Sequence, residues 1–230
     1  MSKALARSNH LWAVSMIDFE SLKMKGLVEL EGVSDEQDIV DLASTLGQLR
    51  LHPNGERVYT LKPSDGEQSL DGTFSRLYGY STFPIHTDTA FWSLPARYVI
   101  MAMKATSQCG TSFLSLATQR EDFKKEIYGL AKKSVFILKN FEGARYVSAY
   151  FRCGEEEGIR FDPNCMNPKN KEAGLFRDKI IELAARNIGI VKWTGDKTLI
   201  IDNWSVLHGR EAVLHEKGSR TLSRIYVEAK

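Results

Sequence analysis

A histidine and an aspartate two positions apart, His86 and Asp88, are residues whose types and spacing could do chemistry together. In an extended chain, alternate side chains point to the same face, so both side chains could reach one point. A neutral imidazole and a carboxylate suit a divalent metal such as Fe(II). A His-x-Asp sequence is common, however, and by itself it usually has only a structural role. The pair predicts a metal site only if a third ligand can be found.

A second histidine, His208, lies far along the chain, shortly after a polar turn at Asp202 and Asn203. An apolar run that is typical of a strand leads into this turn. Alone, His208 is as weak a signal as the first pair. Together, two histidines and one carboxylate can occupy one face of an octahedral iron and leave three positions open for other ligands.

The last strand-like run of the chain carries two arginines, Arg220 and Arg224. In a strand they share one face with Leu222 and Tyr226. One interpretation, usually correct for a strand on its own, places both arginines on a solvated face. The other places both guanidinium groups inside a barrel near a metal. Because guanidinium cannot lose its charge, a buried arginine needs an anionic partner, which a metal-bound dicarboxylate would supply.

Many strand-like runs and a few helices must position these residues. Helical spacing predicts a helix that begins at Ser34, capped by its hydroxyl, and ends at Gly47; two more are expected over residues 118–128 and about 172–187. Strands are expected over residues 26–33, 57–61, 97–105, 111–116, 134–138, 146–152, 158–161, 188–193, 198–202 and 220–228. Strands in such a series favour an antiparallel barrel or two-sheet sandwich with helices packed outside.

Composition bounds the class of protein. The chain has 230 residues, of which 43% are hydrophobic and 26% charged, and we expect a single globular domain over residues 1–230. The formal net charge of +2 gives no reason to expect nucleic acid as a partner. No secretory signal or membrane helix is expected, and three scattered cysteines fit reduced thiols in the cytoplasm. A homo-oligomer is left open.

In their order along the chain, these segments resemble the taurine dioxygenase-like (TauD/TfdA) group of Fe(II)- and 2-oxoglutarate-dependent oxygenases. The resemblance is clearest over about residues 80–116 and 188–228. No single segment is specific, but the ordered set is. The matching segments are His86-Thr87-Asp88, with Phe91 and Pro95 after it; Cys109-Gly110-Thr111-Ser112-Phe113; Asp202-Asn203; His208-Gly209-Arg210; and Arg220-Thr221-Leu222-Ser223-Arg224.

The resemblance implies a fold and a role for each residue. The expected fold is mainly β with α, a double-stranded β-helix (jelly-roll, clavaminate synthase-like) core with flanking helices. The iron ligands would be His86, Asp88 and His208. Arg220 would bind the distal carboxylate of 2-oxoglutarate with help from the Thr111 hydroxyl. The expected substrate-binding residues are Arg224, Phe91, Tyr80 and Arg76.

The resemblance also implies a reaction. With Fe(II), 2-oxoglutarate and O2, the enzyme would hydroxylate an aliphatic C–H bond and release succinate and CO2. The carboxylate at Asp88 favours hydroxylation over halogenation, because a related halogenase would have a small residue there. Desaturation and ring closure stay open. The expected substrate is a small anionic or zwitterionic metabolite, such as an amino acid, a sulfonate or a carboxylate.

Other features leave alternatives open. A non-catalytic jelly roll that binds a small ligand or a metal is a second class of function, and an oxygenase acting on a macromolecule is a third. The polar stretch over residues 62–83 is either a lid beside the site or an ordinary surface loop. His10, His52 and His215 are interpreted as surface or structural residues. Arg160 is a less favoured candidate for the cavity.

Overall fold

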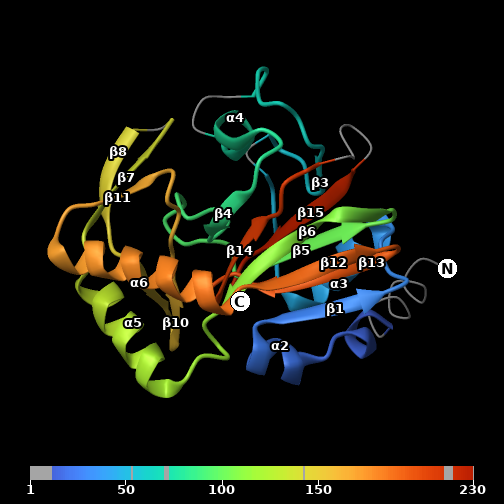
Figure 1. Cartoon of the computed structure of the whole chain (residues 1–230). Coiled ribbons are helices and arrows are strands. Elements are labelled where there is room, and N and C mark those ends of the chain that lie inside the picture. The colour runs from blue at the N-terminus through green and yellow to red at the C-terminus, as the bar shows by residue number, and fades with distance from the viewer. Residues whose placement is uncertain (1–11, 53, 70–72, 142, 215–219, 230) are drawn as a thin grey trace.

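The computed structural model describes residues 12–52, 54–69, 73–141, 143–214 and 220–229. Figure 1 shows a strand-rich half and a smaller half in which two helices pack together. The helices are α2 (Phe19–Lys25), α3 (Glu36–Leu46), α4 (Phe74–Tyr78), α5 (Glu121–Lys133) and α6 (Lys171–Asn187). The strands are β1 (Leu27–Glu31), β2 (Leu49–Arg50), β3 (Tyr59–Leu61), β4 (Phe83–His86), β5 (Tyr98–Met103), β6 (Thr106–Ser115), β7 (Phe136–Asn140), β8 (Gly143–Val147), β9 (Tyr150–Cys153), β10 (Glu156–Ile159), β11 (Met166–Pro168), β12 (Gly189–Thr194), β13 (Lys197–Asp202), β14 (Val206–Arg210) and β15 (Leu222–Val227).

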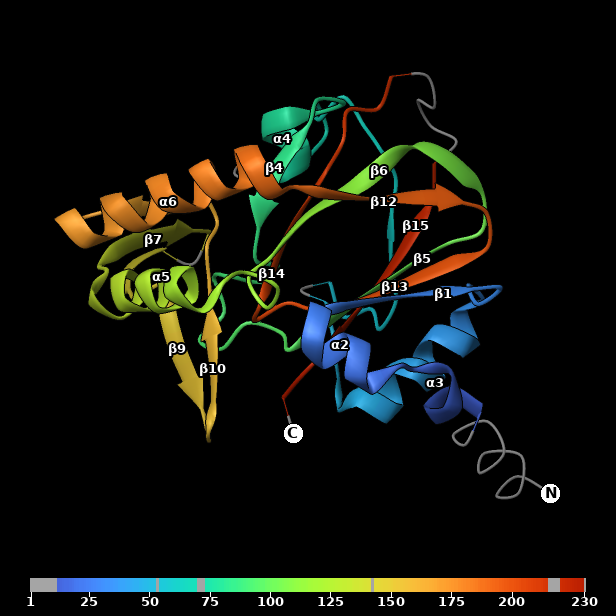
Figure 2. The same ribbon diagram turned by 60° about the horizontal axis from the view of Figure 1, so that its bottom comes forward.

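The larger sheet of the barrel has the order β1-β13-β5-β15-β2, and β3 also pairs with β15. Its pairs are antiparallel, and Ile200 and Ile225 both align with Ile100. These three isoleucines point to the outer face, where they join a buried cluster with Leu22 of α2 and with residues of α3. Helices α2 and α3 therefore cover the outside of this sheet (Figure 2).

The smaller sheet has the order β12-β6-β14-β4 and lies against the inner face of the larger one. A shared buried cluster joins the two sheets, with Val191 and Trp193 from β12 and Met101, Leu199 and Tyr226 from the larger sheet. Side chains alternate along each strand, so one face of each sheet supplies this interior. The expected jelly-roll core with flanking helices is confirmed.

Helices α5 and α6 pack beside this barrel, together with the β11-β7-β8 sheet and the β9–β10 hairpin. The first turn of α6 is capped by Asn170, whose side chain accepts a hydrogen bond from the Ala173 N–H. Residues Phe176, Ile180 and Leu183 then bury one stripe of the helix. The expected helix over about residues 172–187 is confirmed.

The sequence placed several elements correctly and missed others. The helix expected to begin at Ser34 is α3. The prediction that the Ser34 hydroxyl caps this helix was wrong. The N-cap residue is Asp35, and the Ser34 hydroxyl instead donates to the Asp196 carboxylate. A tight hairpin predicted at residues 193–197, between two apolar runs, was wrong: a short turn joins β12 to β13, but β12 pairs with β6 and β13 with β5, so the two strands lie in different sheets. Helices α2 and α4 and strands β4 and β14 were not predicted, because each is too short to show a period. No helix among the described residues is long and apolar enough to cross a membrane.

Candidate metal centre

Strands β4 and β14 bring the two histidines together. They pair antiparallel with His208 directly opposite His86, and the two imidazole centroids lie 5.0 Å apart. Asp88 lies two residues beyond His86, where the chain has left the strand. Its Oδ2 lies 3.3 Å from His208 Nε2, and its Oδ1 lies 3.8 Å from His86 Nε2. One donor atom from each residue lies within 4.8 Å of the others, and all three residues are buried.

The hydrogen bonds of His86 orient it as a ligand. Its Nδ1 lies 3.0 Å from the Pro84 carbonyl oxygen, which can only accept, so Nδ1 carries the proton. Nε2 is then the unprotonated nitrogen, and it faces Asp88. For His208, the buried Nδ1 has no hydrogen-bond partner among the described residues, while Nε2 faces Asp88. Both Nε2 atoms and a carboxylate oxygen therefore form a donor set that suits iron.

The loop that carries Asp88 is held by several hydrogen bonds. The side chain of Asn203 accepts from the Asp88 N–H at 2.9 Å and donates to the Asp88 carbonyl at 3.0 Å. The Thr87 N–H donates to the Phe161 carbonyl at 2.7 Å. Thr89 has a positive φ of 57°, which is strained for a β-branched residue, and its hydroxyl donates to the Asp88 carbonyl and accepts from the Ala96 N–H. These contacts fix the carboxylate without using its oxygens.

Arg224 is half-buried and pairs with Asp88. Its Nη1 lies 3.2 Å from both carboxylate oxygens. Burial opposes ionisation of Asp88, but the Arg224 charge and the two histidines outweigh it and hold the pKa of Asp88 well below its usual range. Burial also lowers the pKa of His208, whereas for His86 the Asp88 carboxylate outweighs burial and raises the pKa. The interior interpretation of Arg224 is thereby favoured over the solvated one.

The two residues expected to bind 2-oxoglutarate both lie in the interior. Thr111 of β6 is buried, and its hydroxyl oxygen accepts a hydrogen bond from Trp193 Nε1 at 3.2 Å. It lies two residues from Phe113, which is directly opposite His208 on β14. Arg220 is 6% exposed and comes just before β15, in step with Arg224. The charge of Arg220 also acts on Arg210 of β14.

The other predicted substrate residues are less closely tied to the triad. Arg76 of α4 is exposed, and its guanidinium donates to the carbonyls of Gly66 and Glu67. The Tyr80 carbonyl accepts from the Val213 N–H at 2.8 Å. The Phe91 ring packs edge-on against Trp92 and Phe141. None of these contacts brings Arg76, Tyr80 or Phe91 to the metal ligands.

Three histidines and Arg160 were assigned no metal role. His52 is buried, and its Nε2 lies 3.0 Å from the Arg224 carbonyl, so it supports the strand that carries Arg224. His10 and His215 lie outside the described residues. The Arg160 guanidinium donates to the carbonyls of Ala90, Trp92 and Ser93, and it thereby holds the loop that follows Asp88.

Two residues near the triad were missed by sequence reasoning. The Phe74 ring, at the start of α4, stacks on the His86 imidazole with centroids 4.0 Å apart. Asp162 is buried, and its charge acts on His86; burial raises the pKa of Asp162, which the His86 charge opposes. No described residue forms an ion pair with Asp162. No sequence pattern around either residue predicts its position near the triad, because both residues lie in loops or short elements.

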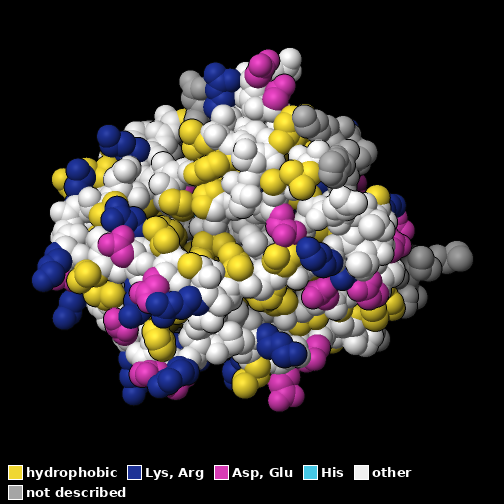
Figure 3. Space-filling model, viewed as in Figure 1, with side chains coloured by type: hydrophobic (Ala, Val, Ile, Leu, Met, Phe, Trp, Pro, Cys, Tyr) yellow, Lys and Arg dark blue, Asp and Glu magenta, His cyan; other side chains and the backbone are white. Residues whose placement is uncertain are grey.

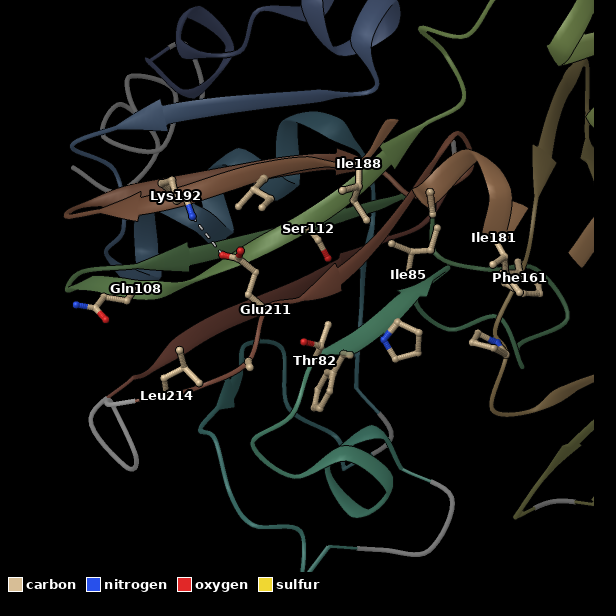
Figure 4. A pocket seen from close by; sticks show the side chains of 16 residues that line it. Thr82, Ile85, Gln108, Ser112, Phe161, Ile181, Ile188, Lys192, Glu211 and Leu214 are labelled. Atoms are coloured by element: carbon tan, nitrogen blue, oxygen red, sulfur yellow. Dashed lines mark hydrogen bonds and ion pairs between the residues drawn. The ribbon is translucent and has the colours of Figure 1, made fainter. Parts of the chain in front are cut away.

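A surface groove lies on the other side of the small sheet. Its volume is about 680 Å³, and it lies between the outer face of the β4–β12 sheet and the end of α6 (Figure 4). Ile85, Ser112 and Lys192 face it, whereas their neighbours His86, Thr111 and Val191 face the interior. Strand alternation therefore separates this groove from the metal ligands.

Comparisons with known proteins place the fold. No protein-family model matches the chain, and no curated protein matches it. Among solved structures, the non-heme iron oxygenase OrfP in complex with Fe and alpha-ketoglutaric acid has a TM-score of 0.75 at 16% sequence identity, covering 99% of this chain and 85% of OrfP. An asparagine oxygenase in complex with Fe(II), 2S,3S-3-hydroxyasparagine and succinate has a TM-score of 0.71 at 15% identity, covering 98% of this chain and 79% of the other. The chain therefore shares the fold of these oxygenases.

Proposed function

We propose that this protein is an Fe(II)- and 2-oxoglutarate-dependent dioxygenase that hydroxylates an aliphatic C–H bond of a small metabolite. The observation that carries the proposal is the buried convergence of His86, Asp88 and His208, whose donor atoms lie within 4.8 Å of one another. Two imidazole nitrogens and one carboxylate oxygen can hold iron on one face and leave its other positions open. The fold that this chain shares with OrfP and with the asparagine oxygenase supports this function.

The finer assignments form part of the same proposal. The chain is a single oxygenase domain of the taurine dioxygenase-like (TauD/TfdA) group, and its partner is a small molecule rather than nucleic acid. The three cysteines are free thiols, which supports a reducing compartment such as the cytoplasm. Assembly into a homo-oligomer stays an open prediction.

When bound, Fe(II) with 2-oxoglutarate would supply the oxidising chemistry that activates O2, with release of succinate and CO2. The chain's own residues would position the reactants. Arg220 would hold the distal carboxylate of 2-oxoglutarate through a charge-assisted pair, and the Thr111 hydroxyl would add a hydrogen bond. The anchored loop around Asp88 would keep the carboxylate in a fixed orientation, so no reorganisation would be needed when the co-substrate binds.

The substrate most consistent with the site is an amino acid. Arg224 would turn from Asp88 toward the carboxylate of the substrate. Asp162, buried near His86 without an ion-pair partner among the described residues, would accept a cationic or amide group from the same molecule. Comparison structures of OrfP contain hydroxyarginine, and the asparagine oxygenase contains hydroxyasparagine. An aliphatic sulfonate or carboxylate is the second choice.

An anaerobic titration with Fe(II) and 2-oxoglutarate tests the proposal directly. We expect a metal-to-ligand charge-transfer band that the His86→Ala variant lacks and that the Arg220→Met variant develops only at much higher 2-oxoglutarate. A band of equal strength in the His86→Ala variant would contradict the assigned ligands. Succinate release should then be screened against arginine, asparagine, other amino acids, sulfonates and carboxylates. An Asp162→Asn variant with unchanged KM for the best substrate would remove Asp162 from the binding site.

A further inference from the structure

A cleft of about 540 Å³ opens on the side of the molecule where α2 and α5 lie. Its lining comes from α2, the residues after β6, one face of α5, β10 and the turn between β13 and β14. Figure 3 shows Lys and Arg side chains, with acidic ones among them, over the lower part of this face. Four lining residues are lysines, and we call this hollow the lysine cleft: Lys23, Lys124, Lys125 and Lys132.

The charges in the lysine cleft do not balance. Its two acidic residues already have partners: Glu157 pairs with Lys132 at 3.2 Å, and Asp202 pairs with Arg97 at 3.2 Å. Lys124 pairs with Glu121, outside the lining, at 3.0 Å. Lys23 and Lys125 form no ion pair with any residue in the described part of the chain. The cleft therefore holds two ammonium groups, from two different helices, that are available to an anion.

The wall between these lysines has an open surface. Gly129 lies in the middle of α5, where glycine is less favourable than alanine. A Cβ added there would meet no atom within 4 Å, so the helix backbone is bare toward the cleft. Tyr128 beside it is half-buried, and its hydroxyl makes no hydrogen bond to a described residue. A ligand could thus lie against the helix backbone, with the Tyr128 phenol among the groups that line the cleft.

We propose that the lysine cleft is a second binding site, which takes a small phosphorylated metabolite. Its phosphate would lie between Lys23 and Lys125, and its uncharged part would lie over Gly129 toward Tyr128. Ammonium groups bind phosphate as point charges, and charge-assisted hydrogen bonds are the strong ones. The volume is in the range of small-molecule sites, roughly 300–1,000 Å³. The carboxylates of Glu157 and Asp202 inside the cleft disfavour an extended polyanion such as a nucleic acid.

Isothermal titration of the metal-free chain with pyrophosphate and with glucose 6-phosphate tests the site. Neither probe requires iron, so the outcome is independent of the proposed oxygenase function. We expect saturable binding of both probes that weakens by about tenfold or more in the Lys23→Glu/Lys125→Glu variant, the size of one lost charge-assisted hydrogen bond. The matched control is Lys139→Glu, which reverses an exposed lysine on β7 and should bind like the parent.

A Gly129→Leu variant separates a shaped site from a diffuse positive field. It keeps every charge and fills the cleft with a side chain that favours a helix. We expect it to lose glucose 6-phosphate binding, with an unchanged circular dichroism spectrum as the folding check. Tyr128→Phe should weaken both probes by a few-fold, the size of one neutral hydrogen bond. Equal binding by parent, Lys139→Glu and Gly129→Leu proteins, or no saturable binding by the parent, would overturn the proposal.

Discussion

The metal centre and the lysine cleft are two polar sites on one framework, and they are built in opposite ways. In the metal centre the charged groups are buried or half-buried and pair with one another, since Asp88 contacts Arg224 and both histidines. In the cleft, Lys23 and Lys125 are exposed and have no described counter-ion. An unpaired charge is costly to the stability of the fold when it is buried, whereas an exposed charge can remain unpaired until a ligand binds. Substitutions should therefore have large effects on stability in the metal centre and small effects in the lysine cleft.

The largest expected effect comes from breaking the central ion pair. Asp88→Ala should lower the free energy of unfolding by about 3–5 kcal/mol, because it leaves the half-buried Arg224 guanidinium without its carboxylate partner. The variant should also lose Fe(II) binding. Urea denaturation and an anaerobic iron titration measure the two effects.

The double variant Asp88→Ala/Arg224→Met separates these effects. Removing both charges should restore most of the stability lost in Asp88→Ala while leaving iron binding absent. A double variant as unstable as the single one would mean that the pair is not what makes Asp88 important for folding. By contrast, Lys125→Glu in the cleft should change stability by less than about 0.5 kcal/mol.

A smaller effect on stability should depend on pH, because His52, which contacts the Arg224 carbonyl, titrates differently in the folded and unfolded chains. Burial, and then the Arg224 charge, lower the pKa of His52 from 6.5 to about 4. The unfolded chain therefore binds a proton between these values that the folded chain refuses, so His52 makes stability fall as pH falls from about 6.5 to about 4. The loss should total about 3 kcal/mol at most.

Replacing His52 by Gln tests this dependence, because glutamine cannot take up the proton. The melting temperature of the parent should fall more steeply than that of His52→Gln across this interval, and the two curves should run parallel above pH 7. Parallel curves throughout would show that His52 does not contribute to the pH dependence of folding.

A small effect of the opposite sign is expected in the wall of the lysine cleft. Gly129→Ala should raise the free energy of unfolding by about 0.5–1 kcal/mol, since alanine favours the helix and its methyl group meets nothing. Thermal denaturation of parent and variant measures the gain. A loss of stability would mean that the helix backbone at this position is not free to accept a side chain.

The sequence predicted the fold, and it predicted that His86, Asp88 and His208 come together, because these signals are local or ordered. A His-x-Asp element, a later histidine and a closing strand with two arginines keep their order whatever the loops between them do. Strand alternation then predicted that Arg220 and Arg224 share a face. Phe74, Asp162 and the lysine cleft could not be predicted in this way. Each of these features forms from segments that are far apart in the sequence, such as α2 and α5. Local sequence patterns do not predict how such segments pack together.

The end of β13 and the turn after it contact both the lysine cleft and the metal centre. Asp202 lines the lysine cleft, and the next residue, Asn203, holds the backbone of Asp88 on both sides. One peptide bond thus joins the wall of the cleft to the side chain that holds the Asp88 backbone. If a phosphate compound that binds beside Asp202 changes the affinity of the metal centre for iron by some factor, thermodynamic reciprocity requires that iron change the affinity of the cleft for that compound by the same factor. Such a protein could sense a second metabolite without a moving domain, by a shift within two adjacent residues.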